Sequence, residues 1–320
     1  MVAETRPILR KPDWLKVRFP AGERYQHLKS LMREQNLHSV CEEARCPNIG
    51  ECWGAGTATI MILGETCTRG CRFCAVNTGN PEGVVDPREP ENVGRALAGM
   101  DLRYVVLTMV DRDDLYDGGA AHVAATVRRI KTHSPELFVE TLVGDFAGVH
   151  ADVETVVRDG APDVFSHNVE VVPELQRKMR DARCSWDRSV DVLLAARAAG
   201  ATVTKSSLMV GCGETDAQVL DAMRSLRDAH VDVLTIGQYL RPSPRHAEVV
   251  RYVEPAEFDH YRDEGLAMGF AFVASGPLVR SSYRAAEAYL EGVLHGRPDQ
   301  DFDRYGRAPM KNHHVRLKVM

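Results

Sequence analysis

The chain has 320 residues, of which 44% are hydrophobic and 27% are charged, and its formal net charge is −5. This composition excludes an intrinsically disordered chain, and 25 glycines and 16 prolines exclude a collagen-like or low-complexity one. No apolar run approaches the roughly 18–20 residues of a membrane span, so we expect no membrane association.

The first residues, MVAETRPILRKPDWLK, lack the apolar stretch of a secretory signal peptide. We therefore predict a cytoplasmic protein, in which thiols stay reduced and grouped cysteines bind metals more often than they form disulfides. Residues 1–40 carry a charge of +4 and residues 296–320 carry +3, so the rest of the chain sums to −12. Basic ends favour an acidic partner, although solvated, partly disordered termini show the same pattern. We expect no nucleic-acid binding, because the sequence shows no strongly basic stretch interleaved with aromatic residues for stacking on bases.

Short apolar runs alternate with longer amphipathic stretches from about residue 58 to residue 294, and helical periodicity is clear at 187–199 and 216–229. Strands that are apolar throughout are typical of parallel sheets covered by crossover helices. Six or seven such units predict an α/β fold with a full or partial parallel barrel. A doubly wound sheet is the alternative, but no Gly-x-Gly-x-x-Gly motif follows the first strand. The predicted strands are 58–63, 104–110, 137–143, 164–169, 202–210, 231–239 and 270–274.

Polar and small residues follow several of these strands. GETCTRGCRFC comes after the first strand, VDRDDLYDGG ends the second, and SHNVE ends the fourth. Because α/β barrels build their sites from the loops that follow the strands, we predict the functional site at this edge of the sheet.

Six of the eight cysteines fall within 34 residues and form two triplets. Thiolates select zinc, copper(I) or iron–sulfur clusters. A structural zinc site needs four ligands, usually in close pairs, and neither triplet has a nearby fourth ligand; disulfides do not fit the predicted compartment. A four-iron cluster is normally held by four thiolates, so a triplet leaves one iron open for reactivity. The triplets are Cys41, Cys46 and Cys52, spaced C-x4-C-x5-C, and Cys67, Cys71 and Cys74, spaced C-x3-C-x2-C.

The second triplet follows a first β-strand and has Phe73 just before its last cysteine, and it resembles the motif of radical S-adenosylmethionine (SAM) enzymes. The resemblance implies a partial (β/α)6-type parallel barrel in which Cys67, Cys71 and Cys74 hold a 4Fe-4S cluster, with Phe73 near the cofactor. It also implies that the open iron binds the amino and carboxylate groups of SAM. Electron transfer then cleaves SAM to a 5′-deoxyadenosyl radical.

The stretch VCEEARCPNIGECW and the C-terminal RSSY resemble the lipoyl synthase family, and matching stretches follow in order along nearly the whole chain. In that family the first triplet binds an auxiliary 4Fe-4S cluster whose fourth ligand is a serine of RSSY. The resemblance assigns this role to Ser282, with Ser281 as the alternative. An alkoxide matches a soft cluster iron less well than a thiolate does, so its bond would release an iron more readily. The implied division is an N-terminal extension over 1–57, a barrel over 58–275 and a C-terminal extension over 276–320.

The reaction implied by this resemblance is sulfur insertion at C6 and then C8 of an octanoyl group bound to a protein lysine, with the auxiliary cluster consumed as the sulfur donor. The implied partners are an octanoylated lipoyl-carrier domain or the glycine-cleavage H protein, a flavodoxin- or ferredoxin-like electron donor, and an iron–sulfur carrier that rebuilds the cluster. The alternatives are another sulfur-inserting radical SAM enzyme and a non-catalytic iron–sulfur electron carrier.

Some residues near strand ends are candidates for SAM contacts, each with a structural alternative. Gly118 and Gly119 either let the backbone approach the methionine part of SAM or form a plain turn. Asn168 and Glu170 either hydrogen-bond SAM or cap the sheet edge.

Two cations are further candidates. Arg241 pairs with the SAM carboxylate, with an acidic partner, or in a structural salt bridge. Lys205 lies inside an apolar strand, where an unpaired ammonium is costly, so it either contacts SAM or forms an ion pair inside the barrel. Cys184 and Cys212 lie outside both triplets and are predicted to be small buried apolar residues. Cys212, Ser207 and the 143–145 stretch depart from the usual family pattern without touching a cluster ligand.

Overall fold

The computed structural model of the protein describes residues 10–16, 26, 29–30, 33, 39, 42, 46, 48–55, 57–100 and 102–282. None of the helices in these ranges is long and apolar enough to cross a membrane. The main strands are β1 (Thr57–Ile62), β4 (Tyr104–Met109), β5 (Phe138–Leu142), β6 (Val164–Ser166), β7 (Thr204–Val210), β8 (Val233–Gln238) and β9 (Phe272–Gly276). A small ribbon pairs β2 (Thr66–Cys67) with β3 (Asn77–Thr78).

The α-helices are α3 (Ile49–Ala55), α4 (Glu89–Ala98), α5 (Ala120–His133), α6 (His150–Glu154), α7 (Gln176–Met179), α8 (Trp186–Ala199), α9 (Asp216–Asp228) and α10 (Pro255–Ala267). Short turns of other helix types are η1 (Asp13–Leu15), η2 (Phe146–Gly148), η3 (Thr155–Gly160) and η4 (Pro173–Leu175).

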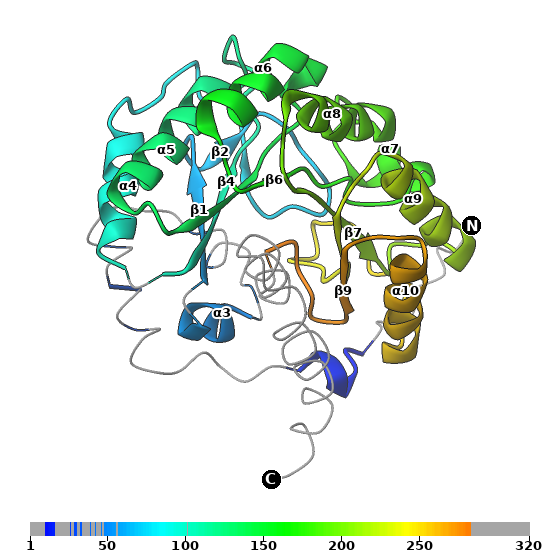
Figure 1. The fold of residues 1–320 in the computed structure, drawn as a ribbon. Coiled ribbons are helices and arrows are strands. Elements are labelled where there is room, and N and C mark those ends of the chain that lie inside the picture. The colour runs from blue at the N-terminus through cyan, green and yellow to red at the C-terminus, as the bar shows by residue number, and fades with distance from the viewer. Residues whose placement is uncertain are drawn as a thin grey trace.

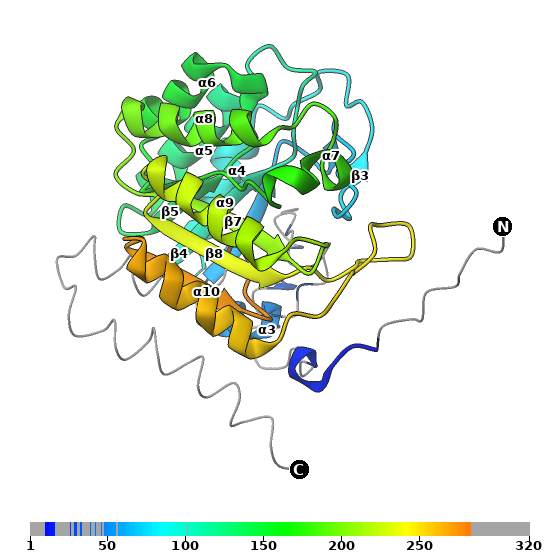
Figure 2. The ribbon, with the colours of Figure 1, turned by 90° about the vertical axis from the view of Figure 1, so that its right-hand side faces the viewer.

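The main strands are all parallel and lie in chain order, β1-β4-β5-β6-β7-β8-β9. A doubly wound sheet reverses its winding partway, so this order is incompatible with that alternative. The connecting helices lie outside a curved sheet, with α8, α9 and α10 along one outer side (Figures 1 and 2). Six strand–helix units followed by β9 confirm the predicted barrel-type α/β fold. The edge strands β1 and β9 do not pair with each other in the described part, so the barrel is partial.

All seven predicted strands are present, and the largest difference at a single strand end is at β6. This strand ends at Ser166, three residues before the predicted end, because its regular pairing with β7 stops there and the chain makes a turn before it meets β7 again at Leu208. Glu170 has a φ of 68° in this turn, and its backbone amide bonds the Ser207 carbonyl of β7. The prediction extended the strand to Val169 because that residue is apolar, although the intervening Ser166, His167 and Asn168 are not typical strand residues.

The two predicted helices correspond to α8 and α9, and their starts are explained by side-chain caps. The Ser185 hydroxyl accepts a hydrogen bond from the Arg188 amide, so α8 begins at Trp186. Thr215 and Gln218 form a reciprocal capping box at the start of α9.

Apolar side chains fill both faces of the curved sheet. The outer face packs under the helices, with one cluster around β1, β4 and β5 and another around β7 and β8. A smaller apolar cluster lies on the concave side and includes Val106, Val233 and Phe272. This arrangement explains why β1 and β8 are buried at every position.

The segments before β1 and after β9 approach each other at the open edge of the barrel. The Ser39 hydroxyl bonds the Thr59 carbonyl of β1, and the Asn48 side chain bonds the Leu278 carbonyl at 2.6 Å. Val279 packs so closely on β8 that a Cβ at Gly237 would overlap its carbonyl. Segments 230 residues apart therefore lie side by side. The proposed boundaries of the three regions stay a prediction.

Candidate functional site

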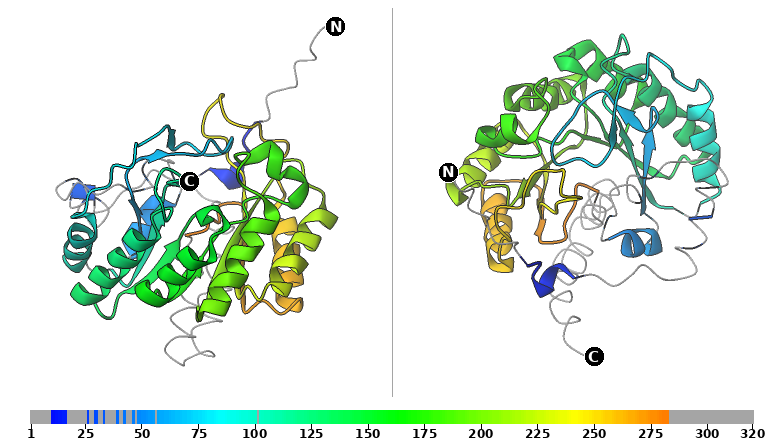
Figure 3. Two further views of the ribbon diagram at one scale, coloured as in Figure 1. Left: turned by 90° about the horizontal axis from the view of Figure 1, so that it is seen from above. Right: turned by 180° about the vertical axis from the view of Figure 1, so that it is seen from behind.

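The loop between β2 and β3 carries Cys67, Cys71 and Cys74 to the carboxyl end of the sheet. Each of these residues is partly exposed, and all three line one cavity of about 230 Å³. The Cys74 amide bonds the Cys71 carbonyl in a tight turn, which directs both side chains into that cavity. The β2–β3 ribbon, α7 and the loop that joins β8 to α10 all lie at this end of the barrel (Figures 2 and 3).

The cavity is bounded by the ends of four neighbouring strands, where the sequence predicted the site. Met61 comes from β1, Thr108 and Met109 from β4, Leu142 from β5, and Asn168 from the turn after β6. Much of this lining is apolar, and the polar groups enter from the loops beyond the strands. The remaining lining residues are Arg69, Phe73, Val76, Val110, Asp111, Val143, Gly144, Asp145, His167, Glu170, Arg180 and Cys184.

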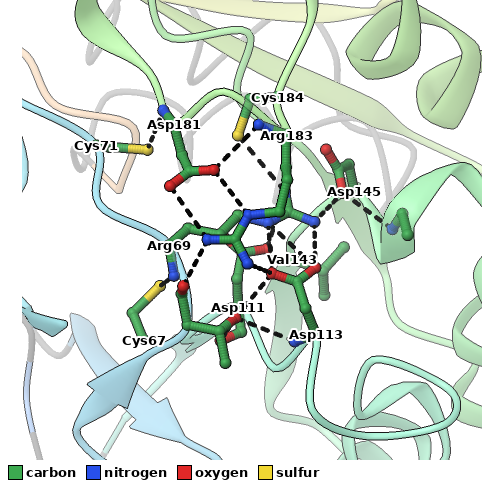
Figure 4. A network of polar contacts seen from close by, with 12 residues as sticks. Cys67, Arg69, Cys71, Asp111, Asp113, Val143, Asp145, Asp181, Arg183 and Cys184 are labelled. Atoms are coloured by element: carbon green, nitrogen blue, oxygen red, sulfur yellow. Dashed lines mark hydrogen bonds and ion pairs between the residues drawn. The ribbon is translucent and has the colours of Figure 1, made fainter. Parts of the chain in front are cut away.

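Arg69 anchors the cysteine loop to the rest of the barrel (Figure 4). Its side chain is only 2% exposed and lies between carboxylates that follow β4 and β5. One terminal guanidinium nitrogen is 2.7 Å from Asp113 Oδ1 and 2.7 Å from Asp145 Oδ1, and the other is 3.5 Å from Asp111. The loop between Cys67 and Cys71 is thus fixed by charge to two neighbouring strands.

The pKa values of the three carboxyl groups differ because their surroundings differ. Burial raises the pKa of Asp111 to about 6, with Asp145 and Asp113 adding to the rise and Arg69 opposing it. Burial is the largest influence on Asp145 and disfavours its ionised form, but the hydrogen bond and charge of Arg69, together with His167 and the Ala147 amide, outweigh that penalty and lower its pKa. Asp113 is likewise held ionised by Arg69, and Arg183 contacts it from the solvent side. The buried Arg69 guanidinium therefore compensates the negative charge of the aspartates around it.

Cys184 lies in this cavity and is more than a small apolar residue. It is 9% exposed, which agrees with predicted burial, but its sulfur is 3.5 Å from an Arg69 guanidinium nitrogen, and it lines the same cavity as Cys71. Interaction with the Cys71 thiol, aided by Arg180 and Arg69, lowers the pKa of Cys184 to about 7. The same interaction and burial raise the pKa of Cys71. Cys212, in contrast, is 1% exposed and packs in a separate apolar cluster.

Asn168 and Glu170 both reach the cavity, as a SAM contact requires. The buried Asn168 Oδ1 accepts no hydrogen bond from the described residues. Glu170 has a left-handed backbone that is costly for a non-glycine residue, and such strain often marks a functional site. Burial raises the pKa of Glu170, while Arg180 opposes the rise. Phe73 also lines the cavity.

The other candidate SAM contacts do not line this cavity. Gly118 and Gly119 form the turn before α5, with φ values of 59° and 93°, and a Cβ at Gly119 would overlap Leu63. Lys205 is 1% exposed and lies 2.8 Å from Glu140, which also accepts a hydrogen bond from Tyr104. For all three residues the structural alternative accounts for the observed contacts.

Arg241 is exposed and bonds carbonyl groups of its own loop, those of His246 and Pro244. It forms no ion pair with a carboxylate in the described part of the chain, so the predicted structural salt bridge is not seen there.

The first triplet is described only in part, because Cys41 lies outside the described residues. Cys46 is partly exposed and Cys52 lies in α3 with 8% exposure. Arg280 is close enough to Cys46 for their charges to interact, and Ser281 and Ser282 follow it directly. The region of RSSY and the region of the first triplet are therefore neighbours, whereas Tyr283, most of residues 1–40 and all of residues 296–320 lie outside the described part.

The donor set at the second triplet fits a multi-iron cluster and SAM. Three thiols from one loop share a cavity with an unpartnered amide oxygen. No three Cys, His, Asp or Glu side chains in the described ranges converge on one point as a single metal ion requires. Thiols that bind different irons of one cluster need no such convergence. Burial and Asp111 raise the pKa of Cys67 to about 11, so binding of iron must displace its proton.

The sequence analysis gave several of these site residues no individual role. Arg69, Asp111, Asp113 and Asp145 lie in stretches that it named, and an arginine inside a cysteine motif and aspartates after two predicted strands were visible signals. Cys184 had no such signal, because it is 110 residues or more from the triplet in the chain.

Comparison with known proteins adds to this geometry. Residues 61–226 match the family described as the radical SAM superfamily, and residues 2–46 match the N-terminal domain of lipoyl synthase. A lipoyl synthase from Sorangium cellulosum is 58% identical over 89% of this chain and 80% of its own length. One from Thermus thermophilus is 54% identical over 91% and 90%, and a mitochondrial one from Eremothecium gossypii is 54% identical over 89% and 79%.

Solved structures support the fold. Methylornithine synthase aligns with a TM-score of 0.50 at 16% identity, over 88% of this chain and 95% of its own. The FeFe-hydrogenase maturase of Carboxydothermus hydrogenoformans aligns with a TM-score of 0.51 at 13% identity, over 91% and 94%. At these identities the likeness concerns the fold alone.

Proposed function

The chain belongs to the lipoyl synthase family of the radical SAM superfamily, and from this premise we propose that it inserts sulfur at C6 and C8 of an octanoyl group carried on a protein lysine. The observation that carries the proposal within the molecule is the shared cavity. Three thiols, the free Asn168 oxygen and an apolar wall meet there at the carboxyl edge of the sheet.

The residues that line the cavity have different proposed roles. Cys67, Cys71 and Cys74 would hold three irons of a 4Fe-4S cluster. When bound, the cluster and SAM supply the 5′-deoxyadenosyl radical that removes hydrogen from the acyl chain. Asn168 and Glu170 would accept hydrogen bonds from SAM, because both residues line the cavity and the buried Asn168 Oδ1 has no partner among the described residues.

Apolar side chains give the cavity its second property. Met61, Val110 and Leu142 line it beside the thiols and leave few partners for water. Such a wall suits a saturated acyl chain and keeps solvent from a reactive radical. Arg69 keeps the cysteine loop in place against β4 and β5.

The second cluster is proposed at Cys41, Cys46 and Cys52 with Ser282. Support comes from the contact between the two chain segments: the Asn48 side chain bonds Leu278, and Arg280 interacts with Cys46. In this arrangement the segment with Ser282 follows directly from a residue that lies beside the first triplet. The sulfide of this second cluster would be the source of both inserted sulfur atoms.

Three protein partners follow from this chemistry. The substrate is an octanoylated lipoyl-carrier domain or the glycine-cleavage H protein, a flavodoxin- or ferredoxin-like protein supplies electrons, and an iron–sulfur carrier rebuilds the consumed cluster. The proposed location is the cytoplasm, supported by seven cysteines among the described residues that form no disulfide. Some relatives are mitochondrial, so this location stays a prediction.

Mass spectrometry of an octanoyl-lysyl carrier peptide after one anaerobic turnover tests the proposal directly. We expect addition of sulfur at both carbons and formation of 5′-deoxyadenosine. Cys71→Ala is the control that should abolish both products, since it removes a ligand of the SAM-binding cluster. Formation of 5′-deoxyadenosine without any sulfur addition by the fully loaded enzyme would contradict the proposed reaction.

A further inference from the structure

Five exposed cations gather on the outer side of the cysteine loop. Arg72 lies between Cys71 and Cys74, and the others come from α7 and from the loop after β8. We call this set the basic rim: Arg72, Arg177, Lys178, Arg241 and Arg245. These elements and the turn before α7 expose three carboxylates, Glu174, Glu248 and Glu254, against five cations, so the rim carries a net positive charge.

Backbone hydrogen bonds hold the rim together with Arg72 at its centre. The Arg72 amide bonds the Met179 carbonyl of α7, and the Arg72 carbonyl accepts from the Ala247 amide at 2.8 Å. Its guanidinium bonds the Lys178 carbonyl at 3.3 Å. The His246 ring nitrogen Nε2 is 2.9 Å from the Cys74 carbonyl, so this loop also rests on the last cysteine. The rim is therefore one surface built around the cysteine loop.

The rim cations differ from most other surface cations in having no acidic neighbour. Within the described ranges none of the five lies within 4.0 Å of a carboxylate. Elsewhere in the described ranges most exposed arginines lie within 4.0 Å of a carboxylate, which leaves their charge largely balanced. Such paired arginines include Arg88, Arg95, Arg129, Arg158, Arg183 and Arg224.

The cysteine loop has two faces. Cys71 and Cys74 direct their thiols into the cavity, whereas Arg72 between them is exposed and does not line it. A protein that binds the rim would thus be separated from the cluster by little more than one loop. It would not have to enter the cavity that SAM and the acyl chain occupy.

We propose that the basic rim is the docking surface for an acidic one-electron donor protein, an inference that rests on the proposed function. The donor loses one electron and the cluster held by Cys67, Cys71 and Cys74 gains it; no atom is transferred. Charge complementarity steers the encounter, and close approach to the loop suits electron transfer.

An acidic acyl-carrier domain is the other protein that a basic surface could attract. Its octanoyl chain must reach into the cavity, while the rim lies on the outside of the loop that bounds the cavity. The position of Arg72 therefore favours the electron donor.

Binding of oxidised, acidic flavodoxin by isothermal titration calorimetry tests the proposal without catalysis. The variant Arg177→Gln/Lys178→Gln should bind about tenfold more weakly than the wild type and lose part of the salt dependence. The matched control is Arg128→Gln/Arg129→Gln, an adjacent exposed pair on the outer helix α5, and its affinity should stay unchanged. Arg72→Gln/Arg245→Gln provides a second pair from other elements of the rim.

Reductant exchange separates this proposal from the proposed function. The rim variants should form 5′-deoxyadenosine more slowly with reduced flavodoxin but at the wild-type rate with dithionite, a small chemical reductant. Unchanged flavodoxin affinity in both rim pairs, or equal weakening in the α5 pair, would overturn the docking surface. Weakened binding of an octanoyl carrier with unchanged flavodoxin binding would also overturn it. Loss of sulfur insertion with both reductants in the wild type would instead count against the proposed function.

Discussion

Replacing Arg69 by alanine should destabilise the loop that carries the second cysteine triplet. The Arg69 side chain is 2% exposed, and its partner Asp145 is 0% exposed. Two of its ion pairs are 2.7 Å long, so the substitution leaves Asp145 and Asp113 without their main cation. Removal of one partner of a buried pair costs about 3–5 kcal/mol. We expect a loss of this size in the free energy of unfolding.

A matched control is available at Arg183, which contacts the same Asp113 from outside. Its side chain is 48% exposed and lies 3.1 Å from Asp113 Oδ2. Exposed pairs contribute about 0–1 kcal/mol, so Arg183→Ala should have a much smaller effect than Arg69→Ala.

Urea unfolding of the cluster-free protein gives the free energies, and anaerobic iron analysis with electron paramagnetic resonance reports the cluster at the second triplet. Arg69→Ala should lose that cluster signal while Arg183→Ala keeps it. The double variant Arg69→Met/Asp145→Asn should recover part of the stability, because the buried charge is removed with its partner. Equal losses in Arg69→Ala and Arg183→Ala, or no recovery in the double variant, would refute the reasoning.

Three other predictions concern pH, packing and the first triplet. Burial and Arg180 lower the pKa of His167 to about 4, below the unfolded value near 6.5. The unfolded chain then binds the proton more readily, so the free energy of unfolding should fall by up to about 3 kcal/mol between pH 6.5 and 4, and urea titrations of His167→Gln should show a weaker pH dependence. Gly237→Ala should displace the Val279 segment, lowering sulfur insertion while 5′-deoxyadenosine formation continues; equal loss of both products would show a general folding defect instead. Cys52→Ala should leave about four irons per chain and SAM cleavage but no sulfur product, and a lipoyl product from this variant would contradict the sacrificial role of the first triplet.

The cysteine spacing carried most of the chemical interpretation. Two incomplete triplets indicated clusters with an open iron, and the all-apolar strands indicated a parallel sheet covered by helices. Both signals are local in the chain: a spacing motif or a run of seven residues carries its own physical reason. The same locality explains the agreement of all seven strands with the predicted runs.

The candidate contacts beyond the motif were harder to predict. Asn168 lines the cavity and Lys205 does not, although both residues were chosen because they are polar and lie within or near the end of a predicted strand. Lys205 found a buried partner in Glu140 on a strand two places away in the sheet. No pattern in the sequence distinguishes a buried lysine that pairs with a carboxylate from one that binds a ligand.

The sequence by itself determined the order of elements, the two groups of thiols and the family to which they belong. Those features depend on residue type, spacing and periodicity. Only the tertiary structure decided that Arg69 pairs with Asp113 and Asp145, which are 44 and 76 residues away in the chain. It also brought Cys184 close to Cys71. It also decided that Arg72 turns outward beside α7 while its neighbouring cysteines face the cavity. The physical reason is that charge pairing and burial act through space, between residues that only the fold brings together.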